Sequence, residues 1–332
     1  MIRFRYMGET HRLKESEKKY FASSKFYEDT NRSTLVAITK SIHGGEDWLD
    51  SVNAFIPQGT WLNSIITSKK RSFFFDEILP IKNKKILDIG SGWGQSTIPL
   101  ARENKVCAIE PNVTKLDFIE AVAHQKHLTH RICYLGANFL ELDFETNFDF
   151  ILSIGVLEWV NKFFSDTQCA DPQSLFLSKC RGCLSGNGKL IVGIENRLGL
   201  KYLLGVKDDH IGVPGIACLE KSLAKKRFHE NFDKELKSFT YSYAEYKELF
   251  QSAGFKDITF FAALPDYKLP EVIVPVSEFN SYILNNEIIV EHDGSDGSYL
   301  KNNEELFSLY QSFAKMNFAH YLVPSFFIVA SL

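Results

Sequence analysis

Short apolar runs recur along the middle of the chain, and stretches of helical periodicity separate them. Runs bounded by turn residues predict strands at 84–90, 105–111, 131–136, 148–155 and 189–194. Between the second and third runs, VTKLDFIEAVAHQKHL has apolar residues three and four apart, which predicts an amphipathic helix. Strands that alternate with helices predict a parallel sheet covered by helices on both faces.

The segments on either side of this pattern are less regular. Residues 1–58 are polar and mixed, which predicts a partly helical N-terminal extension, and 59–79 has the pattern of one amphipathic helix. DITFFAAL (257–264) and the apolar run 323–332 predict two further strands. The roughly sixty residues between them are too many for a plain loop in a compact domain, so they should carry structure.

These patterns predict an N-terminal helical extension, a core, an insertion and a last core strand. The expected bounds are 1–58, 59–263, 264–322 and 323–332.

Composition narrows the classes of function. The formal net charge of -3 indicates no general affinity for nucleic acid. No apolar stretch approaches the roughly 18 residues of a membrane span, and the N-terminus lacks the hydrophobic run of a secretion signal. We therefore expect a soluble cytoplasmic protein. Cys180 and Cys183 form a CRGC motif, but a lone pair late in a predicted helix is weak evidence for metal or redox chemistry.

A glycine-rich turn follows the first core strand, in ILDIGSGWGQS. Its candidate ligand-binding residues are Asp88, Gly90, Ser91, Gly92, Trp93 and Gly94. Glycines allow a tight turn and a close approach of the backbone to a ligand, and the following helix presents free N–H groups. About twenty residues later the next strand ends at Glu110, where a carboxylate can accept hydrogen bonds from ribose hydroxyls.

Two nucleotide cofactors suit this arrangement. Dinucleotide sites have G-x-G-x-x-G, whereas this chain has G-x-G-x-G. A carboxylate at Asp88 would repel a diphosphate but attract a cationic amino group, such as that of S-adenosylmethionine (SAM). The pattern therefore favours SAM over NAD, and a NAD-dependent dehydrogenase or a turn without a ligand are the alternatives.

ILDIGSGWG, AIEP and FDFILSIGVLEWV together resemble the successive motifs of class I SAM-dependent methyltransferases. The resemblance implies an α/β, Rossmann-like, seven-stranded, mostly parallel sheet of order 3-2-1-4-5-7-6, with helices on both faces. It makes 264–322 an insertion between strands 6 and 7, and we expect this insertion and residues 1–58 to act as lids over the acceptor. It implies that the glycine loop lies under the methionine part of SAM and that Glu110 holds the ribose. It further implies that Asn138 and Phe139 flank the adenine and that the turn at Gly155 closes over the donor, with S-adenosylhomocysteine as the product.

IENRLGLKYLLGVKDDHIG, which begins at the end of the fifth core strand, resembles a narrower group of methyltransferases. That group is associated with bacterial surface polysaccharide and lipopolysaccharide biosynthesis and is sometimes fused to glycosyltransferases. The resemblance implies O-methylation of a sugar hydroxyl, with a glycosyltransferase as a further partner. The alternatives are an amine, a carboxylate or a natural-product acceptor, or a SAM-binding chain without catalysis that serves a glycosyltransferase.

Polar residues of this stretch are the candidates for the acceptor site, because parallel α/β folds bind ligands at the carboxyl ends of their strands. His210 is the first candidate for a general base, oriented by Asp208 or Asp209, and Glu195 is the second. His210 could instead anchor the loop, and Glu195 could pair with Arg197. The candidate substrate-binding residues are Asn196, Arg197, Tyr202, Asp209 and Tyr267. Asp208 and Asp209 offer oxygen ligands, but they form no complete set, so no metal site is predicted. The sequence does not indicate the oligomeric state.

Overall fold

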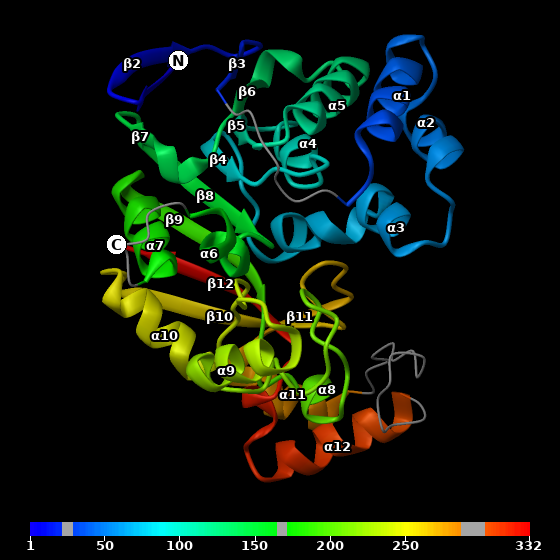
Figure 1. Ribbon diagram of the computed structural model, residues 1–332, viewed down its shortest axis with the longest axis vertical. Coiled ribbons are helices and arrows are strands. Elements are labelled where there is room, and N and C mark those ends of the chain that lie inside the picture. Colours follow the sequence, from blue (N-terminus) through cyan, green and yellow to red (C-terminus); the bar gives the residue numbers. More distant parts are fainter. Residues whose placement is uncertain (22–28, 165–170, 287–302) are drawn as a thin grey trace. The chain divides into compact units, whose positions relative to one another are not determined.

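The computed structural model describes residues 1–21, 29–164, 171–286 and 303–332, and the chain divides into two compact units (Figure 1). The first unit contains Met1–Ile154 and Lys179–Leu190, and the second contains Gly155–Ser178 and Ile191–Leu332. The strand β9 (Leu184–Glu195) therefore contributes its first half to one unit and its second half to the other. Each unit is described by itself.

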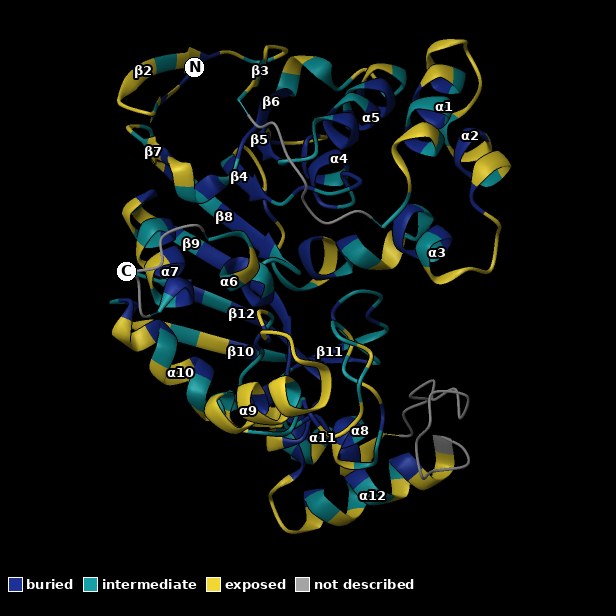
Figure 2. Ribbon diagram, in the orientation of Figure 1, coloured by how far each residue is buried: buried dark blue, intermediate teal, exposed yellow. Residues whose placement is uncertain are grey.

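Parallel strands form the centre of the first unit. Its strands lie in the order β3 (Lys18–Tyr20), β6 (Ile132–Gly136), β5 (Lys105–Ile109), β4 (Lys85–Ile89), β8 (Phe148–Ile154) and β9. The pairs that β4 forms with β5 and β8 are parallel, as are those that β6 forms with β5 and β3. Most residues of β4, β5 and β6 are buried (Figure 2), as expected for apolar runs covered on both faces.

The N-terminal residues form a small antiparallel sheet. It consists of β1 (Ile2–Tyr6), β2 (Glu9–Leu13) and β7 (Leu142–Phe144), in the order β2-β1-β7. Ile2 and Phe4 are buried, whereas the alternate arginines of β1 are exposed. Met7 and Gly8, both with positive φ, make the two-residue turn between β1 and β2. The prediction of a helical N-terminal extension is therefore wrong for its first twenty residues, because IRFRY has the two-residue period of a strand.

Helices surround the parallel strands of the first unit. They are α1 (Arg32–His43), α2 (Trp48–Phe55), α3 (Trp61–Thr67), α4 (Thr97–Leu100) and α5 (Val113–Gln125). The prediction of one helix over 59–79 is wrong. The helix α3 ends before Ser68, whose extended backbone and hydroxyl group cap a separate 3-10 turn, Lys69–Ser72. A π-helical turn, Phe74–Ile78, follows it.

The second unit contains the antiparallel part of the fold. Its strands lie in the order β9, β12 (Ser325–Ser331), β10 (Asp257–Leu264) and β11 (Val272–Pro275), and β10 is antiparallel to both β12 and β11. Its helices are α6 (Val160–Phe163), α7 (Pro172–Gly182, which continues into the first unit), α8 (Leu200–Leu203), α9 (Lys221–Phe232), α10 (Tyr243–Ser252), α11 (Phe279–Asn285) and α12 (Asn303–Lys315). The segment 264–322 thus carries structure, as predicted.

The mixed sheet with its helices fits a Rossmann-like fold, but the predicted count of seven strands is wrong. Among the residues that the structure describes, the sheet has nine strands when β9 is counted once. The two additional strands are β3, which pairs with β6, and β11, which pairs with β10. Both cover edges whose backbone groups would otherwise be unpaired. The polar run KKY at β3 has no strand signature of its own.

A second difference concerns the SGNG segment, which predicts a turn before the fifth core strand. In the structure it lies inside β9, which begins at Leu184. A Cβ atom at Gly188 would lie 2.8 Å from the carbonyl oxygen of Phe148. Glycine is therefore present because two backbones approach closely. No described helix combines the length and the apolar character that crossing a membrane requires.

Candidate functional site

The glycine-rich turn after β4 has the backbone geometry that only glycine adopts easily. Gly90, Gly92 and Gly94 have φ values of +68°, +53° and +78°. At Gly94 a Cβ atom would also lie 3.0 Å from the Cγ1 atom of Ile119 on α5. Ser91 holds the turn against β5, because its N–H group donates a hydrogen bond to the Ile109 carbonyl at 3.0 Å. The turn is thus held against β5, and its three glycines add no side chains to it.

Asp88 lies at the base of this turn and is buried. Its Oδ2 atom accepts a hydrogen bond of 2.5 Å from the Thr97 hydroxyl group at the start of α4. Burial raises the pKa of Asp88 to about 7, and the nearby Glu110 carboxylate adds to the increase, whereas the hydrogen bond from Thr97 opposes it. Asp88 can therefore change its charge close to neutral pH.

Glu110 follows β5 and faces the same turn. Its two carboxylate oxygens accept hydrogen bonds from the N–H groups of Gly92, at 3.0 Å, and Asn112, at 2.9 Å. Burial raises the pKa of this carboxyl group, while Lys115 and the two N–H donors lower it. The structure thus brings the predicted acidic residue and the predicted glycine loop together.

An ion pair beside the loop has no counterpart in the sequence prediction. Lys115 Nζ, from the first turn of α5, lies 2.9 Å from Asp29 Oδ2, and both side chains are largely buried. The same oxygen accepts a hydrogen bond of 3.0 Å from the indole N–H group of Trp93, whose ring packs edge-on against Phe118. Asp29 and Phe118 therefore hold the Trp93 side chain in place.

The two residues predicted to flank the adenine lie after β6. Asn138 Oδ1 accepts a hydrogen bond of 3.1 Å from the Leu140 N–H group and caps the 3-10 turn Phe139–Glu141. Phe139 is buried and stacks on Phe144 with ring centroids 6.3 Å apart. Both side chains thus have local structural partners, and their adenine contacts stay a prediction.

In the second unit, the residue that ends β9 belongs to a buried charged cluster. His210 Nε2 lies 3.5 Å from Glu195 Oε2 and 3.5 Å from Glu158 Oε1. The side chains of Glu195, Glu158 and His210 are 0%, 1% and 5% exposed. We call these three residues the His210 cluster. The His210 ring also packs edge-on against Trp159, and its Nδ1 atom lies 3.7 Å from Asp208 Oδ1.

Carboxylates determine the charge of the His210 ring. Burial alone lowers the pKa of His210, but Glu195, Glu158 and Asp208 together raise it to about 9. Burial raises the pKa of Glu158. The carboxylates thus favour the protonated form of the ring, and its Nε2 atom faces Glu158 and Glu195. The general-base assignment of His210 stays a prediction.

Two lysines neutralise the remaining acidic groups of this region. Lys268 Nζ lies 2.5 Å from Glu195 Oε1 and 2.9 Å from Asp209 Oδ2, and Lys201 Nζ lies 3.0 Å from the same Asp209 oxygen. Burial raises the pKa of Asp209, but Lys268 and Lys201 together hold it well below its usual range. Tyr267, also predicted, is buried, and its hydroxyl group lies 3.5 Å from Glu158 Oε1. The structure therefore places three of the predicted residues in the region around His210: Glu195, Asp209 and Tyr267.

Gly155, another predicted residue, begins the segment that leads to Glu158. Its φ is +72°, and a Cβ atom there would lie 3.0 Å from the Tyr267 hydroxyl oxygen. Tyr202 is buried, with Lys201 Nζ 4.7 Å from the centre of its ring. The structure thus places both residues beside members of the charged region.

Two other predicted substrate residues have structural partners instead. Asn196 donates through Nδ2 to the carbonyl groups of Tyr321 and Val323, at 2.9 and 2.7 Å. Arg197 forms a two-pronged pair with Glu245, with Nε 2.6 Å from one oxygen and Nη2 3.0 Å from the other. The alternative in which Glu195 pairs with Arg197 is wrong. The guanidinium group of Arg197 forms an ion pair with Glu245, and Glu195 forms one with Lys268.

Comparison with known proteins identifies the central part of the chain. Residues 87–192 match the family model of the methyltransferase domain. The rat mitochondrial ubiquinone biosynthesis O-methyltransferase is 26% identical over 211 residues, which cover 58% of this chain and 54% of the rat protein. The chain thus spans about half the length of this curated relative.

Solved methyltransferase structures also resemble the chain, at low identity. Phosphoethanolamine N-methyltransferase 2 of Haemonchus contortus, solved with SAM, aligns with a TM-score of 0.45 and 17% identity, over 91% of this chain and 57% of that chain. The CcbJ methyltransferase of Streptomyces caelestis aligns with a TM-score of 0.42 and 16% identity, over 61% and 84%. Neither likeness identifies an acceptor for this chain.

The match of residues 87–192 to the methyltransferase-domain model agrees with the predictions of a SAM-dependent methyltransferase and of SAM as its cofactor. The residues of the first unit fit such a cofactor. Three glycines with positive φ add no side chains to the turn after β4, and the carboxylates of Asp88 and Glu110 lie beside it. Asp29 Oδ1 is buried and has no hydrogen-bond donor in the part of the chain that the structure describes. The narrower assignment to surface-glycan synthesis stays a prediction.

The sequence prediction gave Asp29 and Lys115 no role, and it did not predict that Glu158 and Lys268 lie in the charged region around His210. Glu158 and Lys268 complete the charged region around His210, and Asp29 and Lys115 form the ion pair beside the loop. Only Glu158 carries a usable signal, because a carboxylate inside the apolar run VLEWV must be buried with a partner. The other three lie in ordinary polar contexts.

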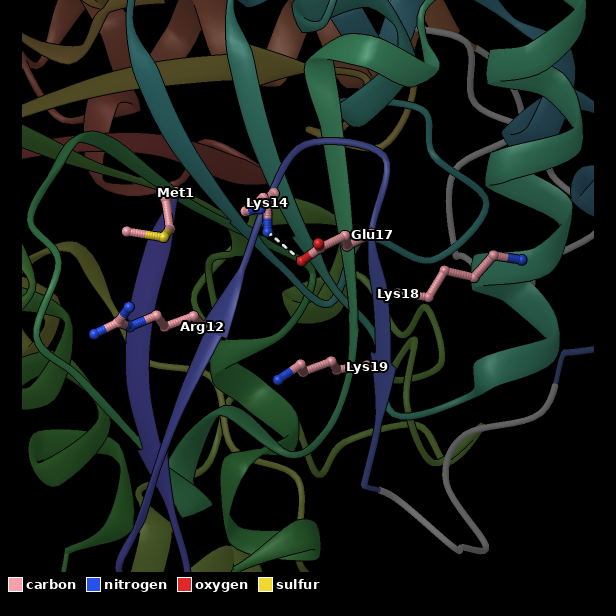
Figure 3. A pocket seen from close by; sticks show the side chains of 6 residues that line it. All are labelled: Met1, Arg12, Lys14, Glu17, Lys18 and Lys19. Atoms are coloured by element: carbon pink, nitrogen blue, oxygen red, sulfur yellow. Dashed lines mark hydrogen bonds between the residues drawn. The ribbon is translucent and has the colours of Figure 1, made fainter.

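Two further features lie outside both sites. Cys180 and Cys183 are buried, and burial raises the pKa of both thiols, which makes them unreactive. A pocket on the N-terminal strands is lined by Met1, Arg12, Lys14, Glu17, Lys18 and Lys19 (Figure 3). Its lining contains none of the predicted site residues, and exposed lysines on a strand edge are usually solvated.

Proposed function

We propose that this chain is a SAM-dependent O-methyltransferase whose acceptor is a sugar hydroxyl in surface-glycan synthesis. The observation that carries the proposal is the His210 cluster, a buried set of proton-accepting groups in the same chain as a methyltransferase domain. A hydroxyl acceptor must lose a proton, and an amine acceptor need not give one to the protein. Buried carboxylates beside a histidine are suited to the first case.

The proposed roles of the first unit follow from its geometry. The glycine loop receives the methionine part of SAM, Asp88 attracts its amino group, and Glu110 holds the ribose hydroxyls. Bound SAM supplies a methyl group that its sulfonium activates toward attack. Lys115 and Asp29 keep Trp93 and the loop in place, so the chain contributes alignment rather than covalent chemistry.

The proposed roles of the second unit concern the acceptor. Its oxygen forms the new O–C bond as the C–S bond breaks, and its proton passes to the His210 cluster. Glu158 Oε2 is buried and has no hydrogen-bond donor among the residues that the structure describes, so it has a lone pair available for that proton. Asp209, Tyr202 and Tyr267 supply polar contacts to the acceptor. A sugar, with several hydroxyl groups, suits a site rich in carboxylates and hydroxyls.

The acceptor is tested by comparing surface glycans from cells with and without the protein. Mass spectrometry is expected to show loss of one methyl group on a sugar oxygen. A methyl group lost from a nitrogen or a carboxylate would replace the sugar-hydroxyl proposal with one of its alternatives. SAM binding with no methylated product, in assays supplied with cell extract, would support a noncatalytic partner of a glycosyltransferase.

His210→Ala tests the cluster. We expect turnover to fall by about 10²-fold or more while the affinity for SAM is unchanged, since the cluster handles the acceptor proton. His229→Ala is the matched control, because His229 is exposed on α9. Turnover within about twofold of the control would reduce His210 to an anchor of its loop.

A further inference from the structure

The spacing inside the His210 cluster is unusual for a hydrogen-bonded group. His210 Nε2 is 3.5 Å from a carboxylate oxygen of Glu158 and 3.5 Å from one of Glu195. Strong N–H···O bonds are about 2.7–3.2 Å long. Ligands at about 2.0–2.2 Å from a tetrahedral metal ion lie roughly 3.3–3.6 Å from one another. One potential ligand atom from each residue lies within 4.8 Å of the others.

A second observation shows that the cluster lacks a full set of partners. Glu158 Oε2 and both carboxylate oxygens of Glu195 are buried, and none accepts a well-aligned hydrogen bond within the described residues. Lys268 Nζ approaches Glu195 Oε1, which leaves Oε2 directed at His210. Glu158 has no lysine or arginine partner in the same residues. Buried carboxylates normally have cationic or hydrogen-bonding partners.

We propose that Glu158, Glu195 and His210 bind one divalent transition-metal ion, such as Zn²⁺ or Mn²⁺. An imidazole with two carboxylates favours these ions over Mg²⁺ and Ca²⁺, which prefer oxygen ligands alone. Three protein ligands leave one coordination position open, as in catalytic metal sites. This set contains neither Asp208 nor Asp209, whose oxygens form no complete ligand set in the sequence.

The neighbouring residues support the ligands. Asp208 faces the other ring nitrogen of His210, at 3.7 Å, as carboxylates do for metal-binding histidines. Lys268 holds the second oxygen of Glu195, which favours binding through one oxygen. The catalytic consequence rests on the proposed function: the open position would take the acceptor hydroxyl and make its proton easier to remove, and Glu158 Oε2, which has no hydrogen-bond donor among the described residues, would accept that proton.

The experiment is a titration of the full chain, freed of metal by chelation, with Co²⁺ alone. Co²⁺ reports its ligands through its visible spectrum, and thiolate ligands add a near-ultraviolet band. We expect one Co²⁺ per chain with no thiolate band, and competition by Zn²⁺. Glu158→Gln, Glu195→Gln and His210→Asn should each weaken binding at least tenfold, with SAM affinity showing that the variants remain folded.

The control is the double variant Cys180→Ala, Cys183→Ala, which should bind Co²⁺ like the unaltered chain. Absence of saturable binding, or unchanged binding in every folded ligand variant, would overturn the proposal. So would a thiolate band that the double variant removes. Full methyl transfer under chelation would overturn the metal's catalytic role and leave the proposed function intact. Metal binding without methyl transfer to any acceptor would support the site and count against the proposed function.

Discussion

Gly92 shows how one residue controls the cofactor loop. Its φ of +53° is strained for any other residue, and its N–H group donates to Glu110. In Gly92→Asp a second carboxylate would stand in the loop beside Glu110. We expect the affinity for SAM, measured by calorimetry, to fall at least tenfold. Gly45→Asp, at another positive φ with open space around it, should keep the affinity. Equal affinities of the two variants for SAM would show that the loop does not bind the cofactor.

Asp88 should make SAM binding depend on pH. Its carboxyl group, with a pKa of about 7, must lose a proton to attract the amino group of SAM. The pKa is raised, so the attracting form is lost as the pH falls through 7. Affinity should therefore decrease below pH 7, by up to about tenfold per pH unit. Asp88→Asn should bind more weakly at pH 8 and show a flatter profile, and an unchanged slope would refute the assignment.

Local spacing revealed some site residues and not others. Asp88, the glycines and Glu110 lie within about twenty-five residues of sequence, so their pattern predicts their proximity. Phe139 matches the family motif after β6, yet its ring stacks on Phe144. The motif identifies which residues are near a cofactor, while packing determines which side chains are available to it.

Among the elements, α10 offers a direct test of a capping signal in the sequence. Ser242 and Glu245 form a capping box, in which each side chain accepts a hydrogen bond from the backbone of the other. Ser242→Ala should lower the free energy of unfolding by about 1 kcal/mol in urea denaturation. Ser252→Ala, at the exposed end of the same helix, should change it by less than half as much. Similar losses in both would mean that the cap contributes little.

The elements themselves were predictable where their periodicity was clear. α10 ends at Ser252, and Gly254 follows with φ of +92°, as its sequence predicts. The N-terminal strands and the break after α3 were not predicted. The N-terminal strands depend on a two-residue turn and on pairing with neighbouring strands, and the break after α3 depends on one serine cap. The local sequence pattern is too weak to predict these features.

For the whole molecule, binding of the right cofactor should stabilise the fold by mass action. At a SAM concentration one hundred times its Kd, the free energy of unfolding should rise by about 2.7 kcal/mol. NAD at the same concentration should leave it unchanged. Thermal unfolding with each ligand measures the difference, and stabilisation by NAD alone would favour the dehydrogenase alternative.

The sequence by itself determined the class of fold and the glycine-rich loop, and it predicts the cofactor that we propose for that loop. Those features depend on short-range periodicity and on glycine conformations, which can be predicted from residues that are close in the sequence. Only the tertiary structure decided that Glu158, Glu195, His210 and Lys268 meet, and that Arg197 belongs to Glu245 instead. These residues are up to 110 positions apart. Their contacts arise because burying charge forces each group to find a partner, and chain topology decides which partners are within reach.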